Sequence, residues 1–288
     1  TLYRTVNHTK TAMGARTLKG WLTRPLLDVV EIRNRQGAVA LFCDNSSARM
    51  VVQEFLRKIP DLERLVNRVR ASSANPRDLA SIRTGLSVIP SLITALPKEL
   101  LPGGVVIGRL HSSTTAVELL EAAIADDPSL SVGEGSAIRD GFDIDLDEAR
   151  SLSGDARSSI AALEEEHRAS TGIKSLKIGY NRVFGYFLEV TKNNLEFVPD
   201  DFERRQTLVN AERFVTPQLK DLESRILSAR DRISELERDL FRRVCAEVAV
   251  QSERIMETAK AIGTLDSIVS MSQASIDNHW IQPVIDDG

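Results

Sequence analysis

The chain has 288 residues, of which 42% are hydrophobic, 27% charged and 5% aromatic. This composition is typical of a folded globular protein rich in helix-favouring residues, and it excludes the disordered and collagen-like classes. Thirty-seven Lys and Arg residues against 41 Asp and Glu residues give a formal net charge of −4. The chain as a whole therefore has no basic field to attract nucleic acid, and any such contact must be local.

The two cysteines, Cys43 and Cys245, lie far apart in the sequence and belong to no Cys-x-x-Cys pair. This spacing predicts reduced thiols, a cytoplasmic location and neither a disulfide framework nor a zinc site. No apolar run is long enough to span a membrane, and the first residues lack the apolar core of a signal peptide. We therefore expect no membrane partner. Because the chain begins at Thr1 rather than at Met, we expect it to be an excised fragment.

The first hundred residues predict a helical bundle. Apolar side chains recur at helical spacing in residues 9–24, 29–41 and 47–70, and Asn75-Pro76 begins a further helix. The stretch 96–115 contains three glycines and two prolines, which predicts a long connection.

Residues 118–148 hold ten acidic side chains and a single basic one, Arg139. These carboxylates are spread over mixed helix and loop without the spacing of a calcium-binding loop. We therefore expect a solvated acidic surface that repels DNA and holds no metal.

Two long helices are predicted in the second half of the chain. The first begins near Asp143 and ends near Gly172, and the second begins at Thr216-Pro217, a cap followed by a first-turn proline. Apolar positions of the second helix alternate by three and four residues, which is a heptad seam. If this helix runs unbroken to Ala261, it is about 65 Å long at about 1.5 Å per residue. We expect the two helices to pair as antiparallel arms, which is more economical than dimerisation of the seam with another chain.

Between the arms the sequence changes to β-branched and aromatic residues in partial alternation, over residues 176–180 and 184–191. Asn181-Arg182 lies between these two runs and predicts a two-residue hairpin turn. That register places Tyr180 opposite Val183 across the ladder.

Residues 204–208 and 212–216 predict a second strand pair, with residues 209–211 near its turn. If this pair points the same way as the first, its turn adds hydroxyl, amide and backbone N–H donors beside Asn181 and Arg182. The predicted fold class is mainly α: a helical core bundle with two long antiparallel helices that carry a small inserted antiparallel β-sheet.

Two long motifs in this sequence resemble one known family. Residues 172–191 (GIKSLKIGYNRVFGYFLEVT) and 205–217 (RQTLVNAERFVTP) resemble the clamp region of the bacterial MutS family of DNA mismatch-repair proteins, and residues 9–22 (TKTAMGARTLKGWL) resemble the start of its core, or lever, domain. The motifs occur in the family's order. The resemblance implies a core or lever domain in residues 1–172 and 217–288, interrupted by a β clamp subdomain in residues 173–216.

In this family the clamp closes over the DNA backbone, so the resemblance implies mismatched double-stranded DNA as the partner, with a second MutS subunit in the full-length protein. The implied backbone contacts are at the two turns: Asn181, Arg182, Thr207, Leu208, Val209 and Asn210. Many family members have Lys where this chain has Val209, which removes one phosphate partner. Residues 174–213 hold seven basic and six acidic side chains, so we expect the fragment alone to bind DNA weakly.

The sequence indicates no catalytic residues. It has no P-loop motif G-x-x-x-x-G-K-[ST], no H-E-x-x-H and no G-x-S-x-G. We expect the fragment to be no enzyme and to bind no cofactor or metal. The resemblance places ATP and Mg²⁺ in the parent protein, outside these residues.

Two alternatives remain open at this point. The chain can be a structural coiled-coil adaptor whose β tip binds a protein partner, or it can come from a MutS relative that acts outside repair.

Overall fold

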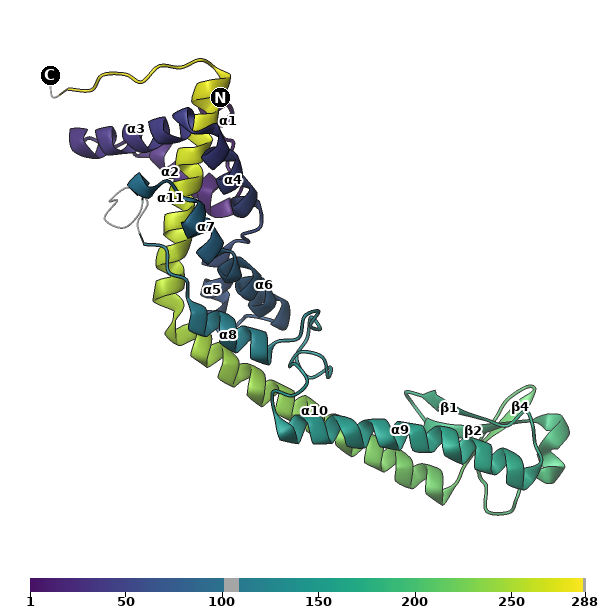
Figure 1. Ribbon diagram of the computed structural model, residues 1–288. Helices are drawn as coiled ribbons and strands as arrows, with labels where there is room; N and C mark the ends of the chain where they lie inside the picture. The colour runs from purple at the N-terminus through teal and green to yellow at the C-terminus, as the bar shows by residue number, and fades with distance from the viewer. Residues whose placement is uncertain (101–108, 287–288) are drawn as a thin grey trace. The chain divides into compact units, whose positions relative to one another are not determined.

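Figure 1 shows the computed structural model, which describes residues 1–100 and 109–286. The chain is mainly helical and contains a four-stranded antiparallel sheet, which confirms the predicted fold class. The residues form two compact units. We call Thr1–Ser131, Ser136–Arg139 and Leu240–Gly288 the helical unit, and Val132–Gly135 and Asp140–Asp239 the sheet unit. Much of the predicted connection at 96–115 lies outside the described residues.

The helical unit confirms the predicted bundle. Its elements are α1 (Leu2–Val6), α2 (Ala12–Thr23), α3 (Val29–Asp44), α4 (Ser46–Arg57), α5 (Leu62–Arg70), α6 (Pro76–Ser87), α7 (Ile89–Ala95), the 3₁₀ turn Lys98–Leu100, α8 (Thr114–Ala123) and α11 (Ser252–Asp277). Helix α11 contacts α1 to α5 and is the central helix of this unit (Figure 1). It is buried on most of its circumference, because apolar or small residues occupy nearly all its positions from Ile255 to Ala274.

A buried carboxylate on α11 fixes the start of α2. Asp266 Oδ2 accepts hydrogen bonds from Thr11 N and Thr11 Oγ1, both at 2.7 Å, and Asp266 Oδ1 accepts one from Lys10 N at 2.9 Å. Thr11 in turn caps α2 by accepting from Gly14 N. This close approach needs a glycine, since a Cβ on Gly14 would lie 2.1 Å from Asp266 Oδ2.

The long second helix does not run unbroken to Ala261 as predicted. Helix α10 (Pro217–Val250) ends before Gln251, whose N–H bonds to the carbonyl of Val248, and α11 begins at Ser252. This is a tightened last turn, which satisfies terminal groups at a helix end. Since no proline or glycine marks the break, the sequence pattern carries no signal for it.

The sheet unit contains the predicted pair of helical arms. Helix α9 (Ile144–Thr171) has the expected boundaries: Asp143 caps its first turn, and Gly172 ends it in the left-handed conformation, with φ 72°. The part of α10 in this unit lies antiparallel to α9. Arg150 near the start of α9 pairs with Glu237 late in α10, whereas Leu163 shares a core cluster with Leu222 early in α10.

A buried carboxylate also joins the arms. Glu237 is fully buried, and its carboxylate accepts from Arg150 Nη2 at 3.1 Å, Gly133 N at 3.0 Å and Gly135 N at 2.9 Å. Both glycines have φ +90°, a backbone region that side chains disfavour. The backbone of residues 132–135 thus directs two N–H groups toward Glu237 of α10. This loop therefore packs on the helix pair as a third segment.

The sheet is formed by β1 (Lys177–Asn181), β2 (Gly185–Thr191), β3 (Glu203–Thr207) and β4 (Ala211–Val215), in the order β1-β2-β4-β3, and the 3₁₀ turn Lys192–Phe197 follows β2. One face packs on the arms through a cluster that includes Leu188, Phe214 and Leu219. The apolar strand residues of this cluster therefore form a core that the sheet shares with the arms.

His167 lies at the edge of this core. Its ring packs edge-on against Phe202, with 5.1 Å between centroids, and its Nε2 is buried without a hydrogen-bond partner among the described residues. Burial lowers the pKa of His167, although Glu166 and Asp201 act in the opposite direction. Burial therefore favours the uncharged form of the imidazole at the edge of this core.

Candidate nucleic-acid interface

The first turn of the sheet, residues 182–184, differs from the predicted two-residue turn. Asn181 pairs with Gly185 and Tyr180 with Tyr186, so the prediction that Tyr180 faces Val183 is wrong. Asn181 Oδ1 accepts from Val183 N at 2.8 Å, and Gly185 has φ +75°. A three-residue loop closed by a residue in the left-handed region is a standard hairpin connection, and here the glycine provides that residue.

The second turn, residues 208–210, connects β3 to β4, and these strands form the predicted second pair. Leu208 N donates to Ala211 O at 2.9 Å, and Asn210 O accepts from Lys192 N at 3.1 Å. Thr207 is the last residue of β3 and is exposed, Leu208 is half-buried, and Val209 is 85% exposed. The turn is therefore tied to the residue that follows β2, while its outer side faces solvent.

The two turns lie at opposite ends of the sheet. β2 and β4 are antiparallel, and Thr191 at the end of β2 pairs with Ala211 at the start of β4. The second turn therefore lies beside the end of β2, whereas the first turn precedes its start. The six residue steps of β2 separate them by roughly 20 Å at about 3.3 Å per residue. The structure thus does not bring Asn181 and Arg182 together with the four predicted residues of the second turn.

The first turn points back along α9 rather than beyond its end. Arg168 Nε donates to the carbonyl of Leu176 at 2.8 Å, and Glu164 Oε2 accepts from Ile178 N at 2.6 Å. As β1 advances, its contacts on α9 therefore move toward the helix N-terminus (Figure 1). Glu223 of α10 also accepts from Tyr186 N at 3.2 Å, so the start of β2 lies against the second arm.

The end of the sheet that carries the second turn holds further polar groups that the sequence reasoning missed. Asn194 Nδ2 donates to Ser175 Oγ and Thr191 Oγ1, both at 3.0 Å, and this links the residues before β1 to those after β2. Lys174 and Lys192 flank this network and are exposed. The Lys-Asn-Asn sequence after β2 is a signal that could have identified this group.

Salt bridges neutralise most of the other cations of the sheet. Arg204 Nε lies 2.8 Å from Glu212 Oε2 and Arg213 Nε lies 3.0 Å from Glu189 Oε2, while Arg205 and Lys220 both face Glu203. The hydrogen bond from Lys220 holds the pKa of the Glu203 carboxyl below its usual range. These cations are therefore already compensated by carboxylates within the sheet unit.

Four exposed cations near the sheet's ends have no ion-pair partner in the part of the chain that the structure describes. They are Lys174, Lys177 and Lys192 at the end with the second turn, and Arg182 at the first turn. Lysine and arginine placed in this way can bind an anionic backbone without reading bases. Residues 174–213 therefore have a net charge near zero, although both ends of the sheet carry exposed cations without an ion-pair partner.

The first turn also exposes apolar surface. Val183 is 80% exposed, and Tyr180 and Phe184 are each 51% exposed. The Tyr180 ring packs against Tyr186, with 4.9 Å between ring centroids. The two ends of the sheet therefore differ in character, since one is apolar with a single arginine and the other is polar with three lysines.

Within residues 1–100 and 109–286, no three His, Cys, Asp or Glu side chains are grouped as metal ligands would be. In the same residues, no helix is long and apolar enough to cross a bilayer.

The comparisons with known proteins agree with one another. A family described as MutS domain III matches residues 1–272. The chain is 42% identical over its whole length to DNA mismatch repair protein MutS from Pelotomaculum thermopropionicum and 44% identical to that from Methanothrix thermoacetophila, and it covers 34% of each protein. It is 41% identical over 99% of its length to the Thermotoga neapolitana protein, of which it covers 35%.

The chain thus spans about a third of the length of the curated relatives that it matches. The match includes both arms and all four strands, because it extends from residue 1 to residue 272. The chain belongs to the MutS domain III family and represents one part of a MutS mismatch-repair protein.

Proposed function

We propose that residues 173–216 form a clamp that holds double-stranded DNA by its phosphate backbone, and that residues 1–172 and 217–288 form the core and lever that carry it. The observation that carries this proposal is the location of the unpaired cations. Arg182 lies at the first turn and Lys174 and Lys192 lie beside the second, whereas the sheet's other arginines are compensated. Phosphate contacts need such donors and carry no sequence information.

The spacing of the two turns suits a duplex. Roughly 20 Å along β2 corresponds to about six base pairs at about 3.4 Å per pair. Asn181 and Arg182 would contact one stretch of backbone, and Thr207, Leu208, Val209 and Asn210 another. Lys192, whose backbone N–H bonds to Asn210 O, supplies the positive charge that Val209 lacks.

The arms give this clamp a stiff support. Their contacts range from the Arg150–Glu237 pair to the Leu163–Leu222 cluster, so α9 and the facing part of α10 move as one body. We propose that this body couples the nucleotide state of an ATPase domain elsewhere in the parent protein to opening of the clamp. In that full-length protein, Ala229→Pro should break α10 and uncouple ATP from DNA release, and unchanged coupling would contradict a lever.

The remaining parts of the proposal concern the parent protein. The parent hydrolyses ATP with Mg²⁺ at residues outside this chain, acts on mismatched DNA in the cytoplasm and pairs with a second MutS subunit. This chain contributes no catalytic residue to that reaction.

A second candidate function has one observation in its favour. The exposed Tyr180, Val183 and Phe184 at the first turn are the kind of apolar surface that binds another protein. In that case the sheet is the tip of an adaptor that binds a protein, and the cations beside the second turn make no contribution to DNA affinity.

Salt dependence separates the two candidates. In the full-length protein, Lys192→Gln should reduce the slope of log affinity against log salt by about 0.9 and weaken mismatched and matched duplexes alike. Fluorescence anisotropy of labelled duplexes over a range of KCl concentrations measures both quantities. Lys58→Gln is the matched control, because Lys58 is an exposed lysine at the end of α4 in the helical unit.

An unchanged slope for Lys192→Gln, with retained DNA binding, would contradict backbone contact at this end of the sheet. A loss confined to mismatched DNA would also contradict it, since phosphate contacts do not discriminate between sequences.

A further inference from the structure

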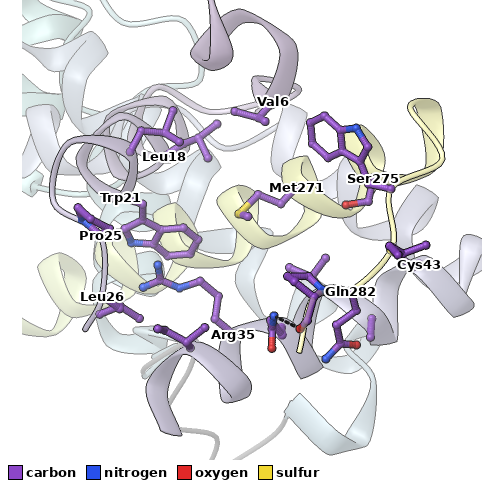
Figure 2. A pocket seen from close by; sticks show the side chains of 18 of the residues that line it. Val6, Leu18, Trp21, Pro25, Leu26, Arg35, Cys43, Met271, Ser275 and Gln282 are labelled. Atoms are coloured by element: carbon purple, nitrogen blue, oxygen red, sulfur yellow. Dashed lines mark hydrogen bonds between the residues drawn. The ribbon is translucent and has the colours of Figure 1, made fainter. Parts of the chain in front are cut away.

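The helical unit contains a cavity that the proposed clamp does not use. It has a volume of about 690 Å³ and lies between α2, α3, α11 and the segment that follows α11 (Figure 2). Its walls are mainly apolar, with Leu18, Val39 and Met271 among the lining residues. This volume falls within the range of pockets that hold small organic molecules.

Both tryptophans of the chain line the cavity. Trp21 comes from α2, and Trp280 comes from the segment after α11. Figure 2 shows the Trp21 indole above the side chain of Arg35, whose Cζ lies 3.6 Å from the ring centroid. The indole and the guanidinium thus form a flat, polarisable wall against which an aromatic ring can stack.

Arg35 is the cation of this cavity, and no carboxylate is ion-paired with it among the described residues. Among residues 1–100 and 109–286, its guanidinium makes neither a hydrogen bond nor an ion pair, although it is half-buried. Burial lowers the pKa of Arg35, which reflects the cost of holding this charge away from water. A guanidinium carries five N–H donors in a planar fork, which matches the oxygens of a carboxylate or sulfonate.

Two carboxylates must be weighed against this charge. Glu31, one turn earlier on α3, raises the pKa of Arg35 against the effect of burial, but it is not among the residues that line the cavity. Asp44 lies at the other end of the same helix and does line the cavity. Nine residues separate Asp44 from Arg35, which is roughly 13 Å along the helix axis. An anionic group beside Arg35 is therefore much closer to the cation than to Asp44.

The outer wall of the cavity is an extended segment held by few contacts. Gln36 Nε2 donates to Pro283 O at 2.9 Å, and Arg33 Nη2 donates to Ile285 O at 2.6 Å. These bonds join α3 side chains to backbone carbonyls, and Gln36 and Pro283 both line the cavity.

We propose that this cavity binds a flat aromatic molecule that carries one anionic group, with the ring against Trp21 and the anion on Arg35. The apolar walls bury the ring system, and the guanidinium, which has no ion-pair partner among the described residues, selects the negative charge. The site lies wholly within the helical unit and is independent of DNA contact by the sheet.

The test compares two probes that differ only in charge. Anilinonaphthalene sulfonate has the proposed chemistry, and N-phenylnaphthylamine has the same rings without the sulfonate. Probe emission, excited through energy transfer from the two cavity tryptophans, gives the affinity of the 288-residue chain for each. We expect saturable binding of the sulfonate probe. Arg35→Met should lower the affinity for this probe about tenfold or more and change the affinity for the neutral probe less than twofold.

Two further variants control for folding and position. Arg70→Met removes an exposed arginine of α5 that is not among the residues lining the cavity, and it should change the affinity for neither probe. Ala40→Phe fills the cavity from α3 and should abolish binding of both.

If Arg35→Met still binds the neutral probe, its cavity is intact. This result distinguishes loss of the charge contact from a failure to fold. Equal loss of both probes by a folded Arg35→Met protein would overturn charge selection. Sulfonate binding that survives Ala40→Phe would place the site elsewhere and overturn the proposal.

Discussion

Two glycines of helix α2 should respond in opposite ways to the same substitution. A Cβ on Gly14 would lie 2.1 Å from Asp266 Oδ2, whereas a Cβ on Gly20 has nothing within 4 Å. Gly14→Ala should therefore destabilise the helical unit, and Gly20→Ala should stabilise it. Because both positions are in one helix, the difference isolates the contact with α11 from helix propensity.

The magnitude follows from what the Asp266 carboxylate loses when it moves away. It accepts from Lys10 N, Thr11 N and Thr11 Oγ1, and a hydrogen bond to a charged group contributes about 1.5–3 kcal/mol. Losing two of them costs about 3–6 kcal/mol, and the alanine returns about 1 kcal/mol of helix propensity. We expect a net loss of about 2–5 kcal/mol for Gly14→Ala and a gain of about 0.5–1 kcal/mol for Gly20→Ala.

Urea unfolding followed by tryptophan fluorescence measures this difference, because both tryptophans lie in the helical unit. The midpoint should fall by about 1–2 M for Gly14→Ala. A change of equal sign and size for the two variants would refute the reasoning, since it would mean that the α2–α11 approach exerts no constraint at Gly14.

Three further predictions concern other parts of the chain. Glu237→Ala leaves Arg150 and two N–H groups without their buried acceptor, so the sheet unit should lose about 3–5 kcal/mol of stability, as measured by far-UV circular dichroism in urea. Because burial lowers the pKa of His167 below its ordinary value near 6.5, the neutral form is favoured in the folded state. The stability that this form confers is complete above pH 6.5 and declines as pH falls below it, and His167→Leu should remove this pH dependence from the melting temperature. Burial raises the pKa of Cys245 to about 11, so its labelling by a disulfide reagent at pH 8 should be much slower than that of a free thiol and should accelerate in urea.

The sequence predicted those parts of the fold that depend on local chemistry. Asp143 and Gly172 bound α9 because capping and left-handed ends use particular residue types. Pro217 begins α10 for the same reason. The break at Gln251 has no such residue at it, and it could not be predicted.

The candidate site was less predictable because it depends on strand order. Adjacent hairpins can pair in more than one order, and only the β2–β4 pairing shows that the turns lie at opposite ends. Likewise, net charge counts Arg204 and Lys192 equally, although Glu212 neutralises the first and no described carboxylate pairs with the second. Cross-strand neighbours decide which cations are available, and a linear sequence does not specify them.

The most direct measurement for the clamp is cross-linking from the second turn in the full-length protein. A photoreactive benzoylphenylalanine at Val209, which is 85% exposed, should cross-link to mismatched duplex DNA. The same group at Leu130, which is 60% exposed within the acidic stretch, should not. A protein that binds DNA with normal affinity yet cross-links from neither position, or from Leu130 alone, would contradict the account.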